Sequence, residues 1–531
     1  MSVGDRLGQV GLPVPVADLV GREWDVIVVG GGHNGLTAAA YLAGAGLAVL
    51  VLERRDRLGG ASTLEQPFAD PRFVISPCAY LVGLLHPLVV EELGLRGRGY
   101  RTFVVDPTQW TPFEDGTSLT QWHDPARTAA SVAAIAPADD DGFLAYEGLF
   151  DRVRTLLRRG PRGDTWLGDS PDPDDLDRLL ATDPEVRDVV RGEPIADVIR
   201  RYVRDERLQT ALHGQGVIGT FAGPYDLGTA WVHAHHGLGL GGGWSYVEGG
   251  LGQVAFAIAD AAVERGAVLC AGTPVAEILP GEGVRLESGE LLRAGTVVSN
   301  ADPKRTLAML ADAPDGFRDR VERWRCESPV LKINCALSRL PTFTAAAGRT
   351  DVYRAQVEIG RSMALTQAAC DRARAGEPAP EWCEVYFQTA YDPTVAAPGT
   401  HVMSVFAQYV PVTPASGAWD DLRDAVADAA FAAIARFAPD VADCVTDRQV
   451  LGPADVEDRI GLTGGHIFQG EILPDQMWSG RFASRTPIAG LYLCGASTHP
   501  GGSVMAVNGR NAALAVLADR AARGARGDEP A

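Results

Sequence analysis

Residues 25–62 read DVIVVGGGHNGLTAAAYLAGAGLAVLVLERRDRLGGAS, and this stretch decides the fold. A β-branched apolar run ends at Gly30, a segment of small, helix-forming residues begins at Gly35, and a second apolar run leads to Glu53. Short apolar runs bounded by glycine are typical of strands buried in a parallel sheet. The stretch therefore predicts a complete strand-helix-strand unit of about 30 residues.

The turn between the first strand and the helix carries the pattern Gly30-x-Gly32-x-x-Gly35. Gly30 permits a tight turn, Gly32 lets a pyrophosphate approach the backbone, and Gly35 lets the helix pack closely on the strand. The helix N-terminus adds amide donors and a favourable dipole. Glu53 stands where a carboxylate accepts hydrogen bonds from ribose hydroxyls and disfavours a 2′-phosphate. The unit therefore predicts a dinucleotide site.

Two further glycine-rich segments indicate which dinucleotide binds. A second glycine pair, Gly59-Gly60, follows the second strand, where it suits a backbone lying against an extended cofactor. At the far end of the chain, residues 491–502 again run from an apolar strand through Gly495 into a glycine-rich turn before a helix. A site supplied from both ends of the chain fits the long FAD molecule better than NAD, so we expect FAD.

Strand-helix units at both ends of the chain enclose segments of a different character. Residues 125–160 and 173–213 have helical spacing, whereas 328–340 and 382–410 alternate like antiparallel strands. We therefore expect an α/β protein with a discontinuous Rossmann-like FAD-binding domain and an inserted mixed α+β substrate domain, made of an antiparallel sheet and a helical region. The expected segments are a loose N-terminal extension at 1–22, the FAD-binding domain at 23–105, 243–303 and 478–525, and the substrate and helical domain at 106–242 and 304–477.

Composition excludes several classes of partner. Acidic residues number 68 against 48 basic ones, so the formal net charge is −20 and a polyanionic nucleic acid would be repelled. No stretch of about 18 apolar residues predicts a membrane span, and no targeting signal is evident. The eight cysteines form no Cys-x-x-Cys pair, which is typical of scattered thiols in a reducing compartment. We expect a soluble cytoplasmic protein, with peripheral membrane contact and oligomerisation left open.

Six segments together resemble the flavin-dependent phytoene-desaturase-like and amine-oxidase-like superfamily. Within it, the chain is similar to the family of pyridine nucleotide-disulfide oxidoreductase domain-containing protein 2 and its bacterial relatives. The lack of a Cys-x-x-Cys pair does not support disulfide reduction. The segments that carry the resemblance are residues 24–62, 244–250, 298–305, 328–334, 461–470 and 491–511.

The resemblance implies which residues hold FAD. Val275 would contact the adenine region through its backbone, and no cysteine or histidine stands at an evident attachment point, so FAD would be non-covalent. Amine oxidases commonly carry arginine at the position of Ala61, and many flavoproteins carry an acidic residue at the position of Ala496. Both differences favour the desaturase-like branch. The ADP half would be held by Gly30, Gly32, Gly35, Glu53, Arg54 and Gly60, with Ala61 beside them. The flavin and its diphosphate would be faced by Gly495, Ser497 and the start of the last helix, Met505, Ala506 and Val507.

The resemblance implies an FAD-dependent oxidoreductase, a desaturase or dehydrogenase that transfers hydride to flavin N5. Its substrate would be a small apolar or amphiphilic molecule, such as a carotenoid-like or acyl compound. Two alternatives stay open: an FAD-dependent amine oxidase, and a flavin-fold interaction or chaperone-like protein with little turnover.

Lys332 is the first candidate for a catalytic role. It and Lys304 are the two lysines among 48 basic residues, and it lies inside an apolar alternating strand, on the same face as Val330 and Asn334. The strand face is either exposed to solvent or turned to the flavin. Superfamily relatives carry a lysine on a comparable strand, where it reaches flavin N5 through water.

His235 and His499 are the other catalytic candidates. His235 belongs to the run Trp231-Val-His-Ala-His-His-Gly237, in which His233 and His235 would share a face on a strand and would be separated on a helix. A structural role, a polar group of the substrate pocket and a metal ligand are the alternatives for this run. We expect no metal, because no third ligand stands at matching spacing. His499 lies in the flavin-side turn, which it either orients or serves in the active site.

Overall fold

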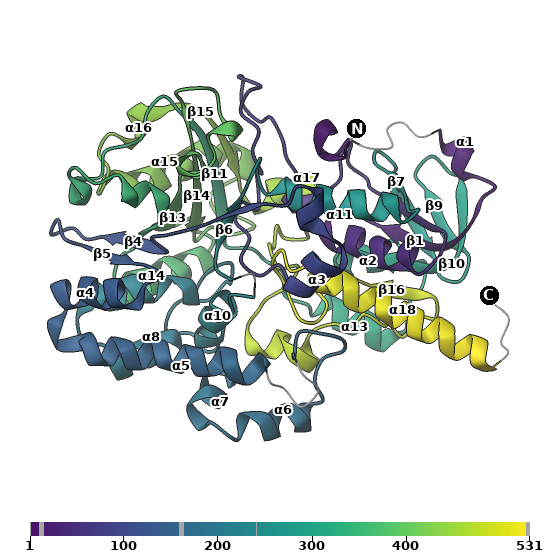
Figure 1. Ribbon diagram of the computed structural model, residues 1–531, viewed down its shortest axis with the longest axis horizontal. Coiled ribbons are helices and arrows are strands. Elements are labelled where there is room, and N and C mark those ends of the chain that lie inside the picture. The colour runs from purple at the N-terminus through teal and green to yellow at the C-terminus, as the bar shows by residue number, and fades with distance from the viewer. Residues whose placement is uncertain (1, 10–14, 159–163, 241, 527–531) are drawn as a thin grey trace.

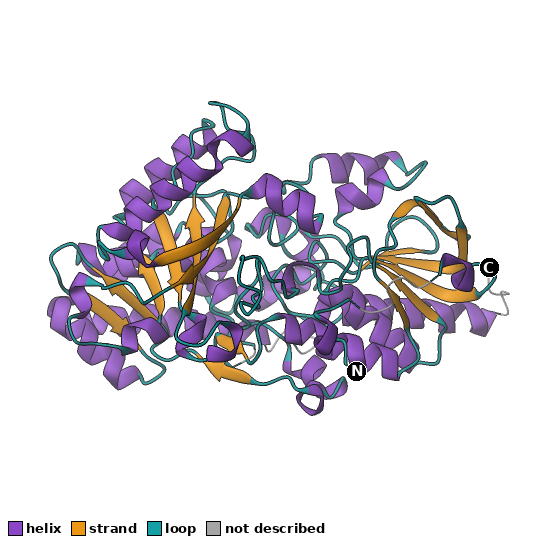
Figure 2. Ribbon diagram, turned by 90° about the horizontal axis from the view of Figure 1, so that it is seen from above, coloured by secondary structure: helices purple, strands orange, loops and turns teal. Residues whose placement is uncertain are grey.

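The computed structural model describes residues 2–9, 15–158, 164–240 and 242–526. Within these residues the strands form two seven-stranded sheets and one two-stranded sheet. Figure 2 shows the two large sheets at opposite ends of the molecule, with helices and loops between them. One large sheet has a parallel centre flanked by helices and the other is mostly antiparallel. The predicted α/β fold class is therefore confirmed.

The first large sheet has the strand order β7-β2-β1-β10, and β9 and β16 share the outer edge of β10. Val26 and Val28 of β1 belong to a different core cluster from Ile27 and Val29, because successive side chains point to opposite faces. Both faces are buried, which explains the continuous apolar run. The strands are β1 (Glu23–Val29), β2 (Val49–Leu52), β7 (Val268–Cys270), β8 (Val275–Leu279), β9 (Gly283–Leu286), β10 (Leu291–Ser299) and β16 (Leu491–Leu493).

Three helices pack beside the first sheet (Figure 1). Small residues allow a close approach between them: a Cβ atom on Gly509 of α18 would lie 2.1 Å from the carbonyl oxygen of Asn34 in α2. The last helix of the chain is thereby held against the first, which brings the two ends of the sequence to one place. The helices are α2 (His33–Gly44), α11 (Gly252–Glu264) and α18 (Val507–Arg526).

The second large sheet has the strand order β15-β11-β14-β13-β12-β4-β5. One face buries aliphatic side chains such as Leu331, Val405 and Val385 against α15 (Trp419–Ala435). The opposite face carries polar and aromatic side chains. The strands are β4 (Gln109–Pro112), β5 (Ser118–Gln121), β11 (Val330–Leu337), β12 (Gln356–Ile359), β13 (Trp382–Tyr386), β14 (His401–Gln408) and β15 (Val445–Leu451).

A helical region lies beside the second sheet (Figure 1). Asp124, Asp172, Asp183 and Asp205 each accept a hydrogen bond from a backbone amide in the first turn of the helix that follows, which is why the helices begin there. No helix among the described segments is long and apolar enough to cross a membrane. The helices are α4 (Pro125–Ile135), α5 (Asp140–Arg158), α6 (Pro173–Leu180), α7 (Pro184–Arg191), α8 (Ile195–Tyr202), α9 (Glu206–Leu212) and α10 (Thr229–His236).

The remaining elements connect these parts. Strands β3 (Thr102–Val104) and β6 (Ser245–Val247) form the two-stranded sheet. The connecting helices are α1 (Val16–Leu19), α3 (Pro87–Glu92), α12 (Pro303–Ala308), α13 (Asp315–Glu322), α14 (Met363–Arg374), α16 (Val441–Cys444) and α17 (Pro453–Ile460).

Two packing features differ from the expected segments. The boundary expected at residue 304 does not coincide with the packing, because Phe317 and Val321 of α13 share a core cluster with Leu493 of the first sheet. The N-terminal residues that are described are not loose. The Val3 amide donates to Asp260, at 2.9 Å, and Leu19 is buried. Residues 10–14 of the expected extension lie outside the described residues.

Candidate functional site

A cavity of ≈ 480 Å³ extends from the first large sheet to the polar face of the second. Gly30, Gly32 and Glu53 line it at the carboxyl ends of β1 and β2, which is where parallel sheets bind ligands. Lys332 and Glu384 line it on the second sheet. The volume lies in the range of cavities that hold small molecules. One end of the cavity is therefore lined by the first large sheet, and the other end is lined by the second.

The glycine turn before α2 admits no side chain. Gly30 has a φ of +100°, which only glycine adopts readily. A Cβ atom on Gly35 would lie 2.2 Å from the carbonyl oxygen of Gly30, and one on Gly32 would lie 2.8 Å from the side-chain amide nitrogen of Asn300. Gly32 therefore presents bare backbone to the cavity beside the N-terminus of a twelve-residue helix. This glycine cradle, formed by residues 30–35, fits the pyrophosphate of a dinucleotide.

Glu53 lies beside the cradle and lines the cavity. One carboxylate oxygen accepts the Gly31 amide at 2.7 Å, and the other accepts the Arg55 amide at 2.8 Å. Burial raises the pKa of Glu53, and these two amides oppose that rise. The carboxylate is fixed in place and keeps lone pairs for the cavity. Arg54 and Val275 also line the cavity here.

The other glycine pair lies against the same cradle. Gly60 has a φ of +57°, and a Cβ atom on it would lie 3.2 Å from the Cα atom of Gly32. Gly60 and Ala61 both line the cavity. Of the residues expected around the ADP half, Gly35 is the one that lies behind the cavity wall, where it fits α2 to Gly30.

Gly495 and Ser497, which the resemblance places at the flavin, do not line the cavity. Gly495 and Ser497 lie beside Ala496, and Ala496 is the one of the three that lines the cavity. A Cβ atom on Gly495 would lie 2.4 Å from the side-chain oxygen of Gln469, and the Ser497 amide donates to that oxygen at 3.2 Å. The pair therefore fixes Gln469, which lines the cavity itself.

The last helix begins two residues later than expected. Helix α18 starts at Val507, so Met505 and Ala506 lie in the turn before it, and Ala506 has a φ of +61°. Met505, Ala506 and Val507 are buried behind the cavity wall. Ser503 and Val504 line the cavity in their place. The glycine-rich turn, rather than the helix, supplies this part of the wall.

His235 and His499 hold the glycine-rich turn and do not line the cavity. The ring of His235 donates to the Gly502 carbonyl at 3.2 Å, and the ring of His499 donates to the Thr165 carbonyl at 2.8 Å. Burial lowers the pKa of His235 to about 3 and that of His499 to about 4, so both rings are neutral near pH 7. Because residues 229–236 form a helix, the strand alternative for this run is wrong. His236 lines the cavity instead.

Lys332 faces the cavity from β11. Its side chain is buried, with 3% of the residue exposed, so the solvent-facing alternative is wrong. The ammonium nitrogen lies 4.1 Å from the centroid of the Tyr80 ring and has no hydrogen-bond partner among the described residues. Burial lowers the pKa of Lys332 to about 7. The cavity therefore holds an amine that is partly charged near neutral pH.

A buried carboxylate on β13 was not singled out from the sequence. One oxygen of Glu384 accepts the side-chain amide of Gln215 at 3.0 Å and also that of Gln356, and the other accepts the Tyr386 hydroxyl at 2.8 Å. All four residues line the cavity. Burial raises the pKa of Glu384 to about 7. The signal in the sequence was an acid inside the apolar strand Trp-Cys-Glu-Val-Tyr.

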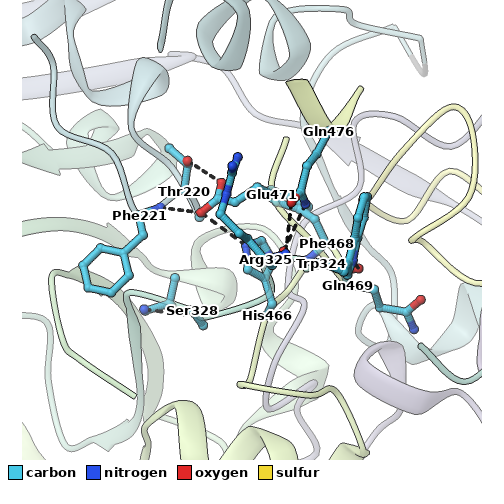
Figure 3. Close-up of polar contacts among 12 residues, drawn as sticks. Thr220, Phe221, Trp324, Arg325, Ser328, His466, Phe468, Gln469, Glu471 and Gln476 are labelled. Atoms are coloured by element: carbon cyan, nitrogen blue, oxygen red, sulfur yellow. Dashed lines mark hydrogen bonds and ion pairs between the residues drawn. The ribbon is translucent and has the colours of Figure 1, made fainter. Parts of the chain in front are cut away.

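A second polar cluster supports the cavity wall formed by residues 465–469 (Figure 3). Glu471 accepts the Thr220 hydroxyl at 2.6 Å and the Phe221 amide at 2.9 Å, and it lies 3.8 Å from the ring of His466. Gln476 exchanges two hydrogen bonds of 3.0 Å with the backbone of Arg325. These contacts fix the loop whose side chains Phe468 and Gln469 line the cavity.

Comparisons with known proteins agree with this geometry. Residues 28–81 match the family model of an NAD(P)-binding Rossmann-like domain. The chain is similar to phytoene desaturase (neurosporene-forming) of Rhodobacter capsulatus, with 27% identity over 92% of this chain and 93% of that one. A solved structure of a putrescine oxidase variant shares the fold, with a TM-score of 0.61 and 16% identity over 94% of this chain and 99% of that one.

The strongest likeness of these is to a mammalian protein. The chain is 34% identical to pyridine nucleotide-disulfide oxidoreductase domain-containing protein 2 of Mus musculus, over 94% of both chains. The predicted resemblance is thereby confirmed. The chain belongs to the family of pyridine nucleotide-disulfide oxidoreductase domain-containing protein 2, among the flavin-type oxidoreductases.

Proposed function

We propose that this protein is an FAD-dependent desaturase or dehydrogenase of an apolar or amphiphilic substrate. The observation that carries the proposal is one cavity that begins at the glycine cradle and ends on the polar face of the second sheet. A dinucleotide held at the cradle would extend towards Lys332 and Glu384. The substrate would then meet the reactive end of the cofactor beside those two side chains.

The residues present fit FAD. The bare backbone of Gly32 and Gly60 would receive the pyrophosphate, and Glu53 would accept the ribose hydroxyls. When bound, FAD supplies a two-electron acceptor for hydride. The chain's own residues position the substrate, exclude water and move protons. The glycine-rich turn at Ser503 and Val504 would form the wall on the opposite side.

We propose that FAD is held without a covalent bond. Cys78 lines the cavity, and burial raises the pKa of its thiol to about 11. A thiol is a poor nucleophile until it ionises. The half-buried His33 and the buried His236 are neutral near pH 7, because removal from solvent lowers the pKa of each to about 4. The cradle would hold the cofactor through its backbone amides and Glu53, with no covalent bond.

The lining of the far end supports an apolar or amphiphilic substrate. Its wall is mostly aromatic and aliphatic, and the polar groups are few. Such a pocket orients the hydrocarbon part of a ligand by its shape, and its few polar groups can hydrogen-bond a polar end of the ligand. The similar phytoene desaturase acts on phytoene, a hydrocarbon. The apolar lining residues are Tyr80, Leu81, Ile218, Trp244, Phe406, Ile467 and Phe468.

An FAD-dependent amine oxidase is the second candidate. The rings of Tyr80 and Tyr386 lie 4.7 Å apart between centroids and both line the cavity. Aromatic rings beside a carboxylate such as Glu384 also suit a cationic amine. This candidate predicts hydrogen peroxide as a product when the reduced flavin meets oxygen.

Anaerobic bleaching of the flavin tests the proposal. The purified protein is mixed without oxygen with phytoene in detergent micelles, an acyl ester, a steroid or putrescine, and the flavin absorbance is followed. Bleaching by an apolar compound supports the desaturase or dehydrogenase. Bleaching by putrescine alone, followed by fast reoxidation in air, favours the amine oxidase. A flavin that light reduces and no substrate reduces contradicts both and favours an interaction role.

A further inference from the structure

The carboxylate of Glu384 lines the cavity and is not among the groups proposed to hold FAD. We propose that Glu384 is the catalytic base, which accepts the proton that the substrate loses as hydride leaves for the flavin. This inference rests on the proposed function and adds the residue that completes the reaction.

Glu384 occupies the middle of a row that crosses four adjacent strands. Lys332 of β11 is in register with Phe406 of β14, Phe406 with Glu384 of β13, and Glu384 with Glu358 of β12. Residues in register on neighbouring strands lie on the same face of a sheet. Lys332, Phe406 and Glu384 all line the cavity, whereas Glu358 lies behind its wall. The row therefore presents the amine of Lys332, the ring of Phe406 and the carboxylate of Glu384 to the same cavity.

The donors around Glu384 are neutral. Gln215, Gln356 and Tyr386 orient both oxygens, and no ion pair to Glu384 exists within the described residues. A buried carboxylate without a cation is costly, and an apolar side chain would fill the same space at less cost. Its partners hold the carboxylate in place in either protonation state, because a tyrosine hydroxyl can accept as well as donate. This is the arrangement that a proton acceptor requires.

Glu384 and Lys332 are the two groups of the row whose pKa values lie near 7. Glu358 is buried with one oxygen unpartnered, and burial together with the charge of Glu384 raises its pKa well above the usual value. Burial likewise raises the pKa values of Tyr80, Tyr246 and Tyr386, which stay neutral. Lys332, beyond Phe406, is the nearby cation of the row. Burial raises the pKa of Glu384 itself only to about 7.

A desaturation removes a hydride from one carbon atom of the substrate and a proton from the adjacent carbon atom. One substrate C–H bond breaks, and its hydrogen leaves with both electrons to flavin N5, which reduces the flavin. The adjacent C–H bond breaks, its electron pair becomes the new π bond, and its proton goes to a carboxylate oxygen of Glu384. The proton later leaves for solvent. The positive charge that develops on the substrate makes that C–H bond acidic, and a fixed carboxylate stabilises this charge.

Two isosteric variants of the FAD-loaded protein test the role. Glu384→Gln removes the base, and its new amide group can donate to the Tyr386 hydroxyl. Glu358→Gln is the matched control, since it makes the same change to the acid in register on the next strand, behind the cavity wall. FAD content, visible spectrum and melting temperature are measured first. Each protein is then mixed anaerobically with phytoene in micelles, or with whichever compound of the panel bleaches the wild type, and the rate constant of bleaching is followed against pH.

Glu384→Gln is expected to keep FAD and to bleach about 100-fold to 10,000-fold more slowly at saturating substrate. Its rate should lose the rise with pH near neutrality that the wild type and Glu358→Gln show. Infrared titration of the oxidised proteins without substrate should show a carboxylic acid that loses its proton near pH 7 in both of those proteins and not in Glu384→Gln. If Glu384→Gln does not fold, Glu384→Asp replaces it, with the same titration and a slowed rate expected.

Three outcomes overturn the proposal. Wild-type and Glu384→Gln rates that agree at saturation contradict it while leaving the proposed function intact. A variant that needs more substrate yet reaches the wild-type rate constant assigns Glu384 to binding a cationic group. A wild type that no compound bleaches overturns the proposed function, and the role of Glu384 falls with it.

Discussion

The ammonium nitrogen of Lys332 lies 4.1 Å from the centroid of the Tyr80 ring, and both residues line the cavity that begins at the glycine cradle. The ring face attracts this nitrogen, which has no hydrogen-bond partner among the described residues. Three donor hydrogens on a buried amine are left for a ligand or a water in the cavity. The second sheet thus offers an unsatisfied cation where the cofactor and the substrate would meet.

Lys332→Met is predicted to change how stability depends on pH. Burial lowers the pKa of Lys332 from 10.5 to about 7, so between these values the unfolded chain binds a proton that the folded chain does not. The free energy of unfolding therefore rises with pH across this window in the wild type. The variant lacks this rise, so it should be the more stable protein at pH 6, and the difference should shrink towards pH 10. Melting temperatures at equal FAD loading measure it.

The same variant tests the catalytic role of Lys332. We expect slower flavin reduction and reoxidation, because an ammonium group near N5 stabilises the anionic reduced flavin. Lys304→Met, which changes the other lysine of the chain, is the control and should leave both rates unchanged. If Lys332→Met alters neither the rates nor the flavin spectrum, the lysine is structural.

Glu53→Gln is predicted to weaken FAD binding by about 1–3 kcal/mol. The carboxylate accepts backbone amides from Gly31 and Arg55, and an amide side chain can accept only one of them. Titration of the apoprotein with FAD measures the loss. Asp56→Asn, next to the cradle and exposed, is the control. An unchanged FAD affinity in Glu53→Gln would show that Glu53 is not at the ribose.

Gly35→Ala is predicted to lower the free energy of unfolding by about 1–3 kcal/mol and to weaken FAD binding. Its Cβ atom would lie 2.2 Å from the carbonyl oxygen of Gly30, and that backbone cannot move without opening the cradle. Gly148→Ala is the matched control, since Gly148 lies within α5 with open space around it. The control should be neutral or gain up to about 1 kcal/mol from helix propensity. Equal melting temperatures for the two variants would contradict the packing at Gly30.

Arg481→Met is predicted to lower the free energy of unfolding by about 3 kcal/mol, because several buried carbonyls lose their donor. The guanidinium of Arg481 donates to the backbone carbonyls of Ala496 and Phe468 at 2.7 Å and to that of Glu471 at 2.8 Å. It thereby ties the C-terminal turn to the loop that lines the cavity. Arg318→Met, which removes an exposed ion pair, should change the melting temperature little. Similar melting temperatures for both variants would show that Arg481 does not hold these segments.

The parts of the structure that local sequence decides were predictable. The strand-helix-strand unit follows from apolar runs and from glycines whose φ values or close contacts exclude side chains, and both signals lie within about 30 residues. The placement of Lys332 on a strand followed from alternation in the same way. The choice between an exposed and a buried lysine did not, because it depends on what covers that face.

The far end of the cavity was not predictable from one sequence. Glu384 lies on β13, Gln215 lies between α9 and α10, and Tyr80 lies in the loop before α3, so only the packing of these three distant segments brings the side chains together. His235 and His236 are neighbours in a run that the sequence left open between a strand and a helix. On a helix, adjacent residues point in different directions, so one of the two meets the cavity and the other holds the turn.

The central claim is that the cradle at Gly30–Gly35 and the cavity beyond it hold FAD without a covalent bond. Acid denaturation of the purified protein, followed by chromatography of the supernatant, tests it most directly. The account predicts a yellow protein that releases about one FAD per chain and leaves a colourless precipitate. A colourless protein that binds only NAD, or a flavin that stays with the precipitate, would contradict it.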